Sequence, residues 1–215
     1  MGTRKGTEHL PRGALLSSIN EAVRELKSDD SQASFEAARR LADLGSKAAT
    51  RSVIEIARRG PNEHSRRFAI YVLRSLEDKR SEGVMARILS SQSEPDGVRD
   101  EAAEALSVFV ENGSPVALRA LLSAQRDPSP AVRLSVAYSL GCSNSLHARN
   151  ALMEMVNDRT VPEGALQSVG EMAREALSFT TTSNAEGIRS SDQLHHFHKS
   201  GKRASPEREK GPDVT

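Results

Sequence analysis

The feature that most constrains this chain is an internal repeat with a period of 32 to 34 residues. Four leucines mark the repeat. The residues three and four positions before each leucine are apolar, a spacing that places all three side chains on one helical face. The leucines are Leu41, Leu73, Leu106 and Leu140, preceded by Ala37 and Ala38, Ala69 and Ile70, Ala102 and Ala103, and Val136 and Ala137. Such a period predicts stacked units that bury their apolar faces against one another.

A second apolar pattern follows each of these leucines in the same register. Residues 12, 15 and 16 positions further on are apolar in all four units. Breakers separate successive units, and their prolines suit the first turn of a helix, where the missing N–H is not needed. The breakers are Gly60-Pro61, Glu94-Pro95 and Asp127-Pro128-Ser129-Pro130. Each unit is therefore predicted to be a pair of amphipathic helices.

Further apolar stripes flank the four units. The pattern predicts a leading helix from Pro11 to Lys27, and a capping box at Thr160 to Glu163 is predicted to begin a final helix. After Phe179 the chain is rich in Ser, Lys, Arg, Glu and Gly, a composition typical of disorder. The predicted organisation is a flexible N-terminal arm at 1–10, a repeat solenoid at 11–180 and a disordered C-terminal tail at 181–215.

Composition excludes several classes of protein. No apolar run could span a membrane, no apolar core of a secretory signal is present near Met1, and the single Cys142 cannot form an internal disulfide. These features predict a cytoplasmic protein without a membrane segment. Aromatic residues make up only 3 % of the chain and tryptophan is absent. Stacked bases and aromatic-cage ligands are therefore not the expected partners.

The helix pairs resemble short HEAT repeats of the bacterial type that is also found in phycobilisome lyase subunits. Two stretches with Val-Arg near their start, residues 97–106 and 131–141, resemble the repeat best. Units one and two depart from the pattern, because Ala33 and Ser65 replace the valine and Ser34 replaces an arginine. The resemblance implies an all-α fold, a right-handed α-solenoid of about four helix pairs with flanking capping helices. It also implies that the second helices line a concave groove, and that protein binding is the default activity.

The predicted binding site is the groove face of the second helices. Positions ten, fourteen and seventeen after each leucine point most directly away from the apolar face, at 100° per residue. We expect a non-enzymatic scaffold or adaptor that binds a partner protein there, with no catalytic residue, cofactor or metal. The sequence names no particular partner and no oligomeric state. The predicted partner-binding residues are Arg51, Glu55, Arg58, Arg87, Ser90, Val116, Ala120, Ser123, Asn150, Glu154 and Asn157.

Two alternative functions stay open at this point. The resemblance alone favours an accessory subunit of a phycobilin-type chromophore lyase, although the groove positions contain no His or Cys. The basic first third favours nucleic-acid binding, since residues 14–93 have a net charge of +3 and residues 94–180 a net charge of −5. However, no single outward column of Lys and Arg passes through all units, and the acidic half would repel a long duplex.

Catalytic interpretations of the sequence find little support. The chain has no glycine-rich nucleotide-binding motif and no Gly-x-Ser-x-Gly elbow. HEAT-type deoxyhypusine hydroxylases use His-Glu pairs, and HEAT-like alkylpurine DNA glycosylases use tryptophans, neither of which occurs here. Cys142 would need a lowered pKa to act as a nucleophile. The tail cluster of His195, His196 and His198 is interpreted as a disordered histidine-rich patch rather than a metal site.

Two charged clusters receive structural interpretations. An arginine recurs seven positions before three of the leucines and is expected to bond carbonyls or acids between units, such as Asp96 or Asp127. The acids of the third unit are expected on a solvated outer face. The arginines are Arg66, Arg99 and Arg133, and the acids are Asp100, Glu101 and Glu104.

Overall fold

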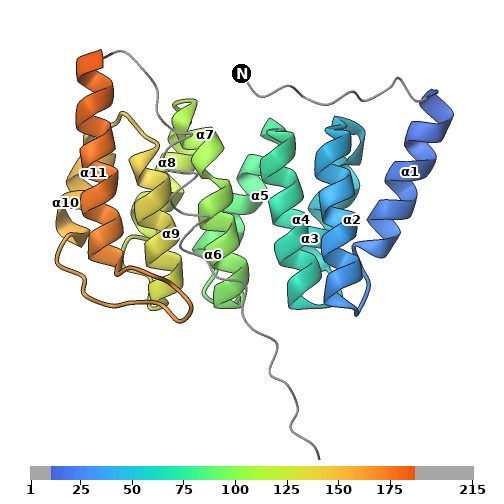
Figure 1. Cartoon of the computed structure of the whole chain (residues 1–215), viewed down its shortest axis with the longest axis horizontal. Coiled ribbons are helices and arrows are strands. Elements are labelled where there is room, and N and C mark those ends of the chain that lie inside the picture. The colour runs from blue at the N-terminus through green and yellow to red at the C-terminus, as the bar shows by residue number, and fades with distance from the viewer. Residues whose placement is uncertain (1–10, 187–215) are drawn as a thin grey trace, which may run out of the picture.

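The computed structural model describes residues 11–186, with side chains described as far as Phe179. Within this range the chain forms eleven α-helices, one short 3-10 helix and no strand (Figure 1). The elements are α1 (Arg12–Glu25), α2 (Ser31–Leu44), η1 (Lys47–Ala49), α3 (Thr50–Arg59), α4 (Glu63–Leu76), α5 (Lys79–Ser90), α6 (Asp96–Ala105), α7 (Ser107–Glu111), α8 (Pro115–Ser123), α9 (Pro130–Gly141), α10 (Leu146–Met155) and α11 (Val169–Glu186).

The helices form two layers (Figure 1). The first helices of the units, α2, α4, α6 and α9, pack side by side in one layer, which α11 extends. The second helices, α3, α5, α8 and α10, form the layer behind it, and each packs against the first helix of the next unit. Helix α1 covers α2 at one end, and α11 covers α9 and α10 at the other. The predicted α-solenoid of four helix pairs with flanking helices is confirmed.

The repeat leucines form the centre of a continuous core between the layers. Leu41 is 1 % exposed, and Leu73, Leu106 and Leu140 are 0 % exposed. The residues three and four positions before each leucine are also buried. Most of them are alanines, whose small side chains let neighbouring first helices approach closely. In the third unit the first helix is interrupted at Leu106, so that α6 and α7 replace the single predicted helix.

The predicted start of the last helix is wrong. Thr160 to Glu163 lie in a loop, and Leu166, which follows the predicted start of the final helix, is 65 % exposed. Gly164 has a φ of 75°, a left-handed conformation that ends any continuous right-handed helix at this point. The capping box that begins α11 is instead formed by Ser168 and Glu171. The Ser168 backbone N–H donates to Glu171 at 2.7 Å, and the Glu171 N–H donates to the Ser168 hydroxyl at 3.2 Å.

The last helix does not end at the predicted C-terminal boundary of the solenoid. Helix α11 continues to Glu186, past the predicted boundary at residue 180. The predicted arm at 1–10, most of the predicted tail and its three histidines lie outside the described residues. Within the described part of the chain, no helix is both long enough and apolar enough to cross a membrane.

Candidate functional site

The second helices place most of the predicted binding residues on one exposed face, called the second-helix face below. Ten of the eleven predicted residues are exposed, nine of them on α3, α5, α8 and α10 and the tenth, Asn157, in the turn after α10. Ala120 is the exception and is only 8 % exposed, so its assignment to the binding face is wrong. Helix α8 packs against both α5 and α9, which cover a wider arc of its surface than the apolar pattern predicts.

The second-helix face has an excess of basic residues. Together α3, α5, α8 and α10 contain eight Lys or Arg residues and three Asp or Glu residues. All three acids have partners: Glu55 pairs with Arg58 at 3.3 Å, Glu154 pairs with Arg126 at 3.1 Å, and Glu82 accepts a hydrogen bond from a serine.

Four exposed arginines, one from each second helix, have no such partner, and Arg59 at the end of α3 is a fifth. Within the described residues, none of the four has an ion pair or a side-chain hydrogen bond. Arg51 and Arg87 are among the predicted binding residues, whereas Arg119 and Arg149 are not, because the four arginines occupy different columns on successive helices. A count of charges per predicted helix would have found them. They are Arg51, Arg87, Arg119 and Arg149.

The arginine column of the first helices holds consecutive units together, as predicted. Arg133 shows the arrangement: it donates to the Asp127 carbonyl oxygen, at 2.7 Å, and to the Asp158 carboxylate, at 2.8 Å. It therefore joins the loop that precedes its unit to the loop that ends it. Arg66 donates likewise to the Ala57 carbonyl oxygen and to Glu94, and Arg99 to Gln92 and to Asp127. Asp96 is not among these partners and accepts from Ser129 instead, at 3.2 Å.

The prediction that the acids of the third unit lie on a solvated face is wrong for two of the three, and the third, Glu101, is half-buried. Asp100 is 6 % exposed and Glu104 is 5 % exposed. Asp100 accepts a hydrogen bond from Ser135 of the next unit, and Glu104 forms a buried ion pair with Arg74 of the preceding unit. Because first helices pack against one another on both sides, the flank of α6 that a helical wheel shows as polar is an inter-unit contact.

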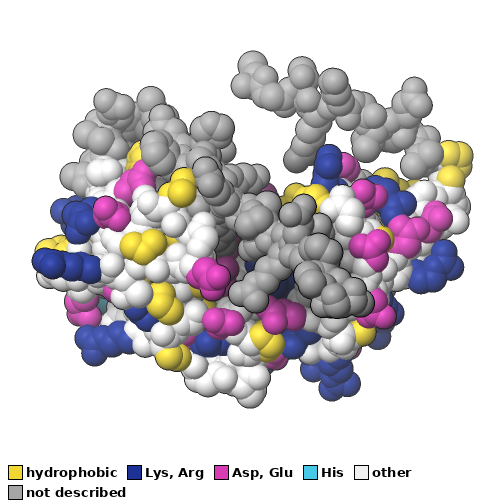
Figure 2. All heavy atoms as spheres, turned by 60° about the horizontal axis from the view of Figure 1, so that its bottom comes forward, with side chains coloured by type: hydrophobic (Ala, Val, Ile, Leu, Met, Phe, Trp, Pro, Cys, Tyr) yellow, Lys and Arg dark blue, Asp and Glu magenta, His cyan; other side chains and the backbone are white. Residues whose placement is uncertain are grey.

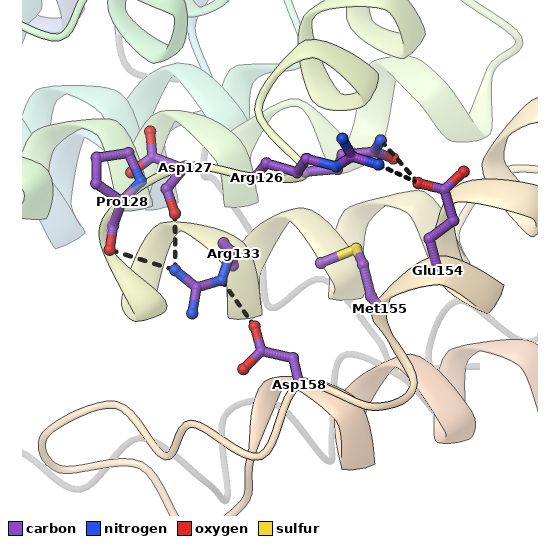
Figure 3. Close-up of a pocket in the computed structure, with 8 residues that line it drawn as sticks. Arg126, Asp127, Pro128, Arg133, Glu154, Met155 and Asp158 are labelled. Carbon is purple, nitrogen blue, oxygen red and sulfur yellow. Dashed lines mark hydrogen bonds and ion pairs between the residues drawn. The ribbon is translucent and has the colours of Figure 1, made fainter.

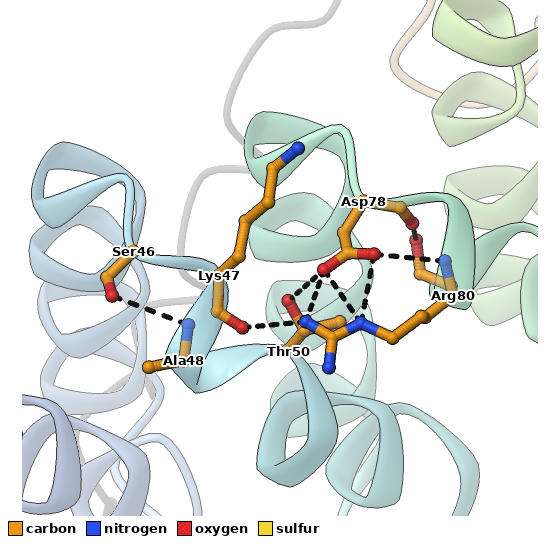
Figure 4. A network of polar contacts seen from close by, with 7 residues as sticks. Ser46, Lys47, Ala48, Thr50, Asp78 and Arg80 are labelled. Atoms are coloured by element: carbon orange, nitrogen blue, oxygen red, sulfur yellow. Dashed lines mark hydrogen bonds and ion pairs between the residues drawn. The ribbon is translucent and has the colours of Figure 1, made fainter.

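A second polar network joins units one and two near the start of α5 (Figure 4). Asp78 accepts from the Thr50 hydroxyl at 2.9 Å, and from the Arg80 backbone N–H at 3.0 Å, which caps α5. The Arg80 guanidinium bonds the same carboxylate and also donates to the Lys47 carbonyl oxygen at 2.9 Å. The hydrogen bonds from Arg80 hold the pKa of Asp78 well below its usual range, despite the opposing effect of burial.

A pocket of about 380 Å³ lies at the seam between the third and fourth units (Figure 3). Two ion pairs form much of its wall, Arg126 with Glu154 and Arg133 with Asp158. Partial burial raises the pKa of Asp158, but the hydrogen bonds from Arg133 and Thr160 together outweigh this effect and hold that pKa below its usual range. Since these charged groups already bond one another, the pocket offers a ligand few unsatisfied groups.

The remaining chemistry-bearing residue, Cys142, is not activated. Burial, with a smaller effect from the Glu111 carboxylate, raises the pKa of its thiol to about 12. Its sulfur lies 3.7 Å from the Tyr138 carbonyl oxygen, to which it donates. His147 is exposed on α10. Because the pKa of the thiol lies far above neutral, Cys142 is protonated at neutral pH. Within the described residues, no three His, Cys, Asp or Glu side chains converge as a metal site would require.

The side of the molecule formed by the first helices differs from the second-helix face. Figure 2 shows the lower edge of Figure 1 turned toward the viewer. Dark-blue Lys and Arg side chains and magenta Asp and Glu side chains are interspersed over it. The first helices α2, α4, α6 and α9 contain seven residues of each sign. The basic excess is thus specific to the second helices.

Comparison with known proteins agrees with this architecture. The family model for HEAT repeats matches residues 50–141 and 88–170. Among solved structures, a chain from the complex of CpcE and CpcF of phycocyanin lyase from Nostoc sp. PCC7120 is similar, with a TM-score of 0.63 and 19 % sequence identity. The match covers 75 % of this chain and 98 % of that chain. Similarity at this level of identity shows a shared fold. Comparison with curated protein sequences gives no match.

Proposed function

Because the chain belongs to the family of HEAT-repeat proteins, we propose that it is a non-enzymatic scaffold that binds a partner protein on the second-helix face. The observation that supports this most is the exposure of ten predicted binding residues on or next to the four second helices. A face that spans several units offers a broad surface whose shape is fixed by the packed core behind it. The concave form of this face stays a prediction from the resemblance.

The disposition of charged groups also favours a scaffold over an enzyme. The arginines and acids of the first helices bond one another between units, where they hold the solenoid together. Cys142 has a raised pKa and is a poor nucleophile. Acid–base catalysis would need titratable side chains that face a shared cavity and whose different environments separate their pKa values. The second-helix face instead presents solvated side chains, which suit recognition.

A capture experiment with a charge-reversed face tests this function. Wild-type protein and the double variant Arg58→Glu with Arg87→Glu are used as bait in native lysate, with and without nuclease. We expect the wild type to retain a stoichiometric protein that survives nuclease, and the variant to lose it. Both substitutions are at exposed positions, so circular dichroism should show unchanged helix content.

A matched control variant distinguishes loss of binding at the second-helix face from a general effect of net charge on partner binding. Arg24→Glu with Arg39→Glu makes the same charge change at exposed positions on α1 and α2, outside the second-helix face. This variant should retain the partner. A partner held equally by wild type and by the Arg58→Glu, Arg87→Glu variant would contradict the proposed site. Material that disappears with nuclease would indicate nucleic acid rather than protein as the ligand.

The similarity to a chain of the phycocyanin lyase complex favours one second candidate, an accessory subunit of a chromophore lyase. This candidate requires a sister subunit and contact with a tetrapyrrole. Titration of the protein with a free open-chain tetrapyrrole, followed by visible absorbance, tests the second requirement. A saturable spectral shift is expected if this candidate is right, and an unchanged spectrum contradicts it.

A further inference from the structure

The charges of the second-helix face indicate what kind of partner it recognises. Each second helix has at least one exposed arginine without an acidic partner in the described structure: Arg51 on α3, Arg87 on α5, Arg119 on α8 and Arg149 on α10. Arg59, the last residue of α3, is a second such arginine on that helix. We infer that the first four arginines bind an extended acidic segment of the partner protein, with a carboxylate at about every third residue. This inference rests on the proposed scaffold function and specifies the chemistry of its partner.

The positions of the four arginines form a band across the layer. Counted from the repeat leucine of each unit, they stand between nine and fourteen positions further on. At a rise of 1.5 Å per residue, this spread is about 7.5 Å along the helix axes, under one and a half turns. The second helices are successive members of one packed layer. A chain that crosses them at right angles would therefore meet one arginine per helix.

The spacing of helices sets the spacing of the carboxylates. Packed helices lie roughly 8–10 Å apart, and an extended chain advances about 3.3 Å per residue. Three residues of an extended segment thus span the distance from one second helix to the next. An acid at every third position would place one carboxylate near each arginine. A helical segment, at about 1.5 Å per residue, would need six or seven residues for the same distance.

The electrostatics of the face favour a carboxylate ligand. The acids on these helices are already bonded: Glu55 to Arg58, Glu154 to Arg126, and Glu82 to Ser114. They do not compete for the four arginines. A guanidinium presents a planar fork of donors that matches a carboxylate in two parallel hydrogen bonds. An acidic segment would therefore gain charge-assisted bonds without first breaking ion pairs within this face.

Exposed apolar side chains beside the arginines favour a protein segment over nucleic acid. Val116 on α8 is 39 % exposed, and Leu146 and Met153 on α10 are 57 % or more exposed. Apolar side chains of a peptide could bury this surface, whereas a phosphodiester backbone could not. The four second helices contain no Phe, Tyr or Trp, and the imidazole of His147 is their one exposed aromatic ring, so they offer no row of rings on which successive bases could stack. The segment should therefore be acidic throughout and apolar at the end that lies on α10.

Synthetic peptides test this inference directly. A fluorescently labelled peptide with Glu at every third position and Leu residues at one end is titrated with the full-length protein, followed by anisotropy. One comparison peptide has Gln in place of Glu, and another has the same composition with its Glu residues adjacent. We expect the first peptide to bind at least about tenfold more tightly than either comparison peptide, and to weaken as salt increases.

A set of charge-neutral variants locates the binding to the four arginines. The combined variant Arg51→Gln, Arg87→Gln, Arg119→Gln and Arg149→Gln should bind the acidic peptide at least about tenfold more weakly than the wild type. A control variant removes the same charge from exposed positions near the N-terminal end of the solenoid, with Arg12→Gln, Arg24→Gln, Lys27→Gln and Arg39→Gln. The control should bind within about twofold of the wild type, since these residues lie outside the second helices.

Several results would overturn the inference, and they separate it from the proposed function. Equal binding of the Glu and Gln peptides, or of wild type and the four-arginine variant, would exclude the acidic segment. Equal binding of the adjacent-Glu peptide would exclude the three-residue spacing. A single-stranded or duplex oligonucleotide that displaces the peptide and itself depends on the four arginines would assign the face to nucleic acid. In a further case, no peptide binds while the variant Arg58→Glu with Arg87→Glu still loses a lysate partner. That result would support the proposed scaffold function and contradict only the inference that the partner segment is acidic.

Discussion

The two layers of this solenoid use the same residue types for different purposes. The first helices contain equal numbers of basic and acidic residues, and many of these bond one another or the adjoining loops. The second helices contain more than twice as many basic as acidic residues, and an arginine on each lacks a partner within the described chain. One layer is therefore held by its charges, whereas the other presents them to solvent.

The comparison shows that an arginine's role depends on the layer to which its helix belongs. Arg99 and Arg119 are both in the third unit, yet the first is 5 % exposed and paired, and the second is exposed. Buried ion pairs are costly to break because each leaves an uncompensated charge. Exposed arginines contribute little to stability and can interact with other molecules. The same substitution should therefore destabilise the protein far more in the first layer than in the second.

The largest expected effect comes from breaking a buried pair of the first layer. Arg99→Met removes the partner of Asp127, whose side chain is fully buried, and should lower the free energy of unfolding by about 3–5 kcal/mol. Chemical denaturation followed by circular dichroism measures this. Arg119→Met, the matched change in the second layer, should stay within about 0.5 kcal/mol of the wild type. Similar losses in the two variants would contradict the contrast between the layers.

A core substitution affects both layers together. Leu106 is 0 % exposed at the point where α6 ends, so Leu106→Ala should cost about 2–5 kcal/mol through the cavity that it leaves. Both layers should unfold in a single transition, because each second helix packs on the first helix of the next unit. Val116→Ala, at an exposed position, serves as the comparison. A Leu106→Ala protein with wild-type stability would show that this leucine is not a central core residue.

The Asp78 network gives a smaller effect that depends on pH. Asp78→Ala removes the cap of α5 and the bond to Thr50, and should cost about 1–2 kcal/mol at neutral pH. The folded state lowers the pKa of Asp78, so its stabilising effect is complete above the ordinary pKa of aspartate. This effect is then lost as the pH falls through the lowered value.

Denaturation curves at several pH values test this sign. The stability difference between wild type and Asp78→Ala should shrink as the solution is acidified below pH 4. Asp43→Ala, at an exposed position on α2 without a described bond partner, provides the control and should show little difference at any pH. A difference that grows on acidification would mean that the carboxylate is not the stabilising form.

The smallest effect on stability is expected for the four arginines of the second-helix face. Their combined replacement by Gln should change the midpoint of thermal unfolding by no more than a surface substitution normally does, since no described bond is lost. The same variant should lose peptide binding, as described above. Loss of stability together with binding would show that these arginines help to hold the units together, as the first-layer arginines do.

Periodicity was enough to predict most of the fold. The repeat leucines, the preceding small residues and the breakers located four helix pairs, because burial of one helical face leaves a regular pattern in the sequence. The same signal failed at the ends of elements. It placed a capping box at Thr160 to Glu163, whereas Ser168 and Glu171 form the actual one, since an apolar residue such as Leu166 can lie in a loop.

The exposure of the candidate site residues was predicted in part, whereas their role in binding stays a prediction. Outward positions on a helical wheel identified exposed residues because a second helix has one neighbouring layer, so its far side meets solvent. Ala120 failed because α8 has neighbours on both flanks. Arg119 and Arg149 were missed because their columns differ from those of Arg51 and Arg87, and only their common exposure on adjacent helices brings the four arginines into one band.

The sequence by itself determined the repeat, the helix pairs and the core, since each follows from local periodicity and from turn-forming residues. Only the tertiary structure decided which charges hold the molecule together and which are displayed. Asp100 and Glu104 have the pattern of a solvated surface, yet the packing of α6 between α4 and α9 buries them. The reason is physical: a helical wheel describes one helix against solvent, whereas ion pairs between units depend on how neighbouring helices pack.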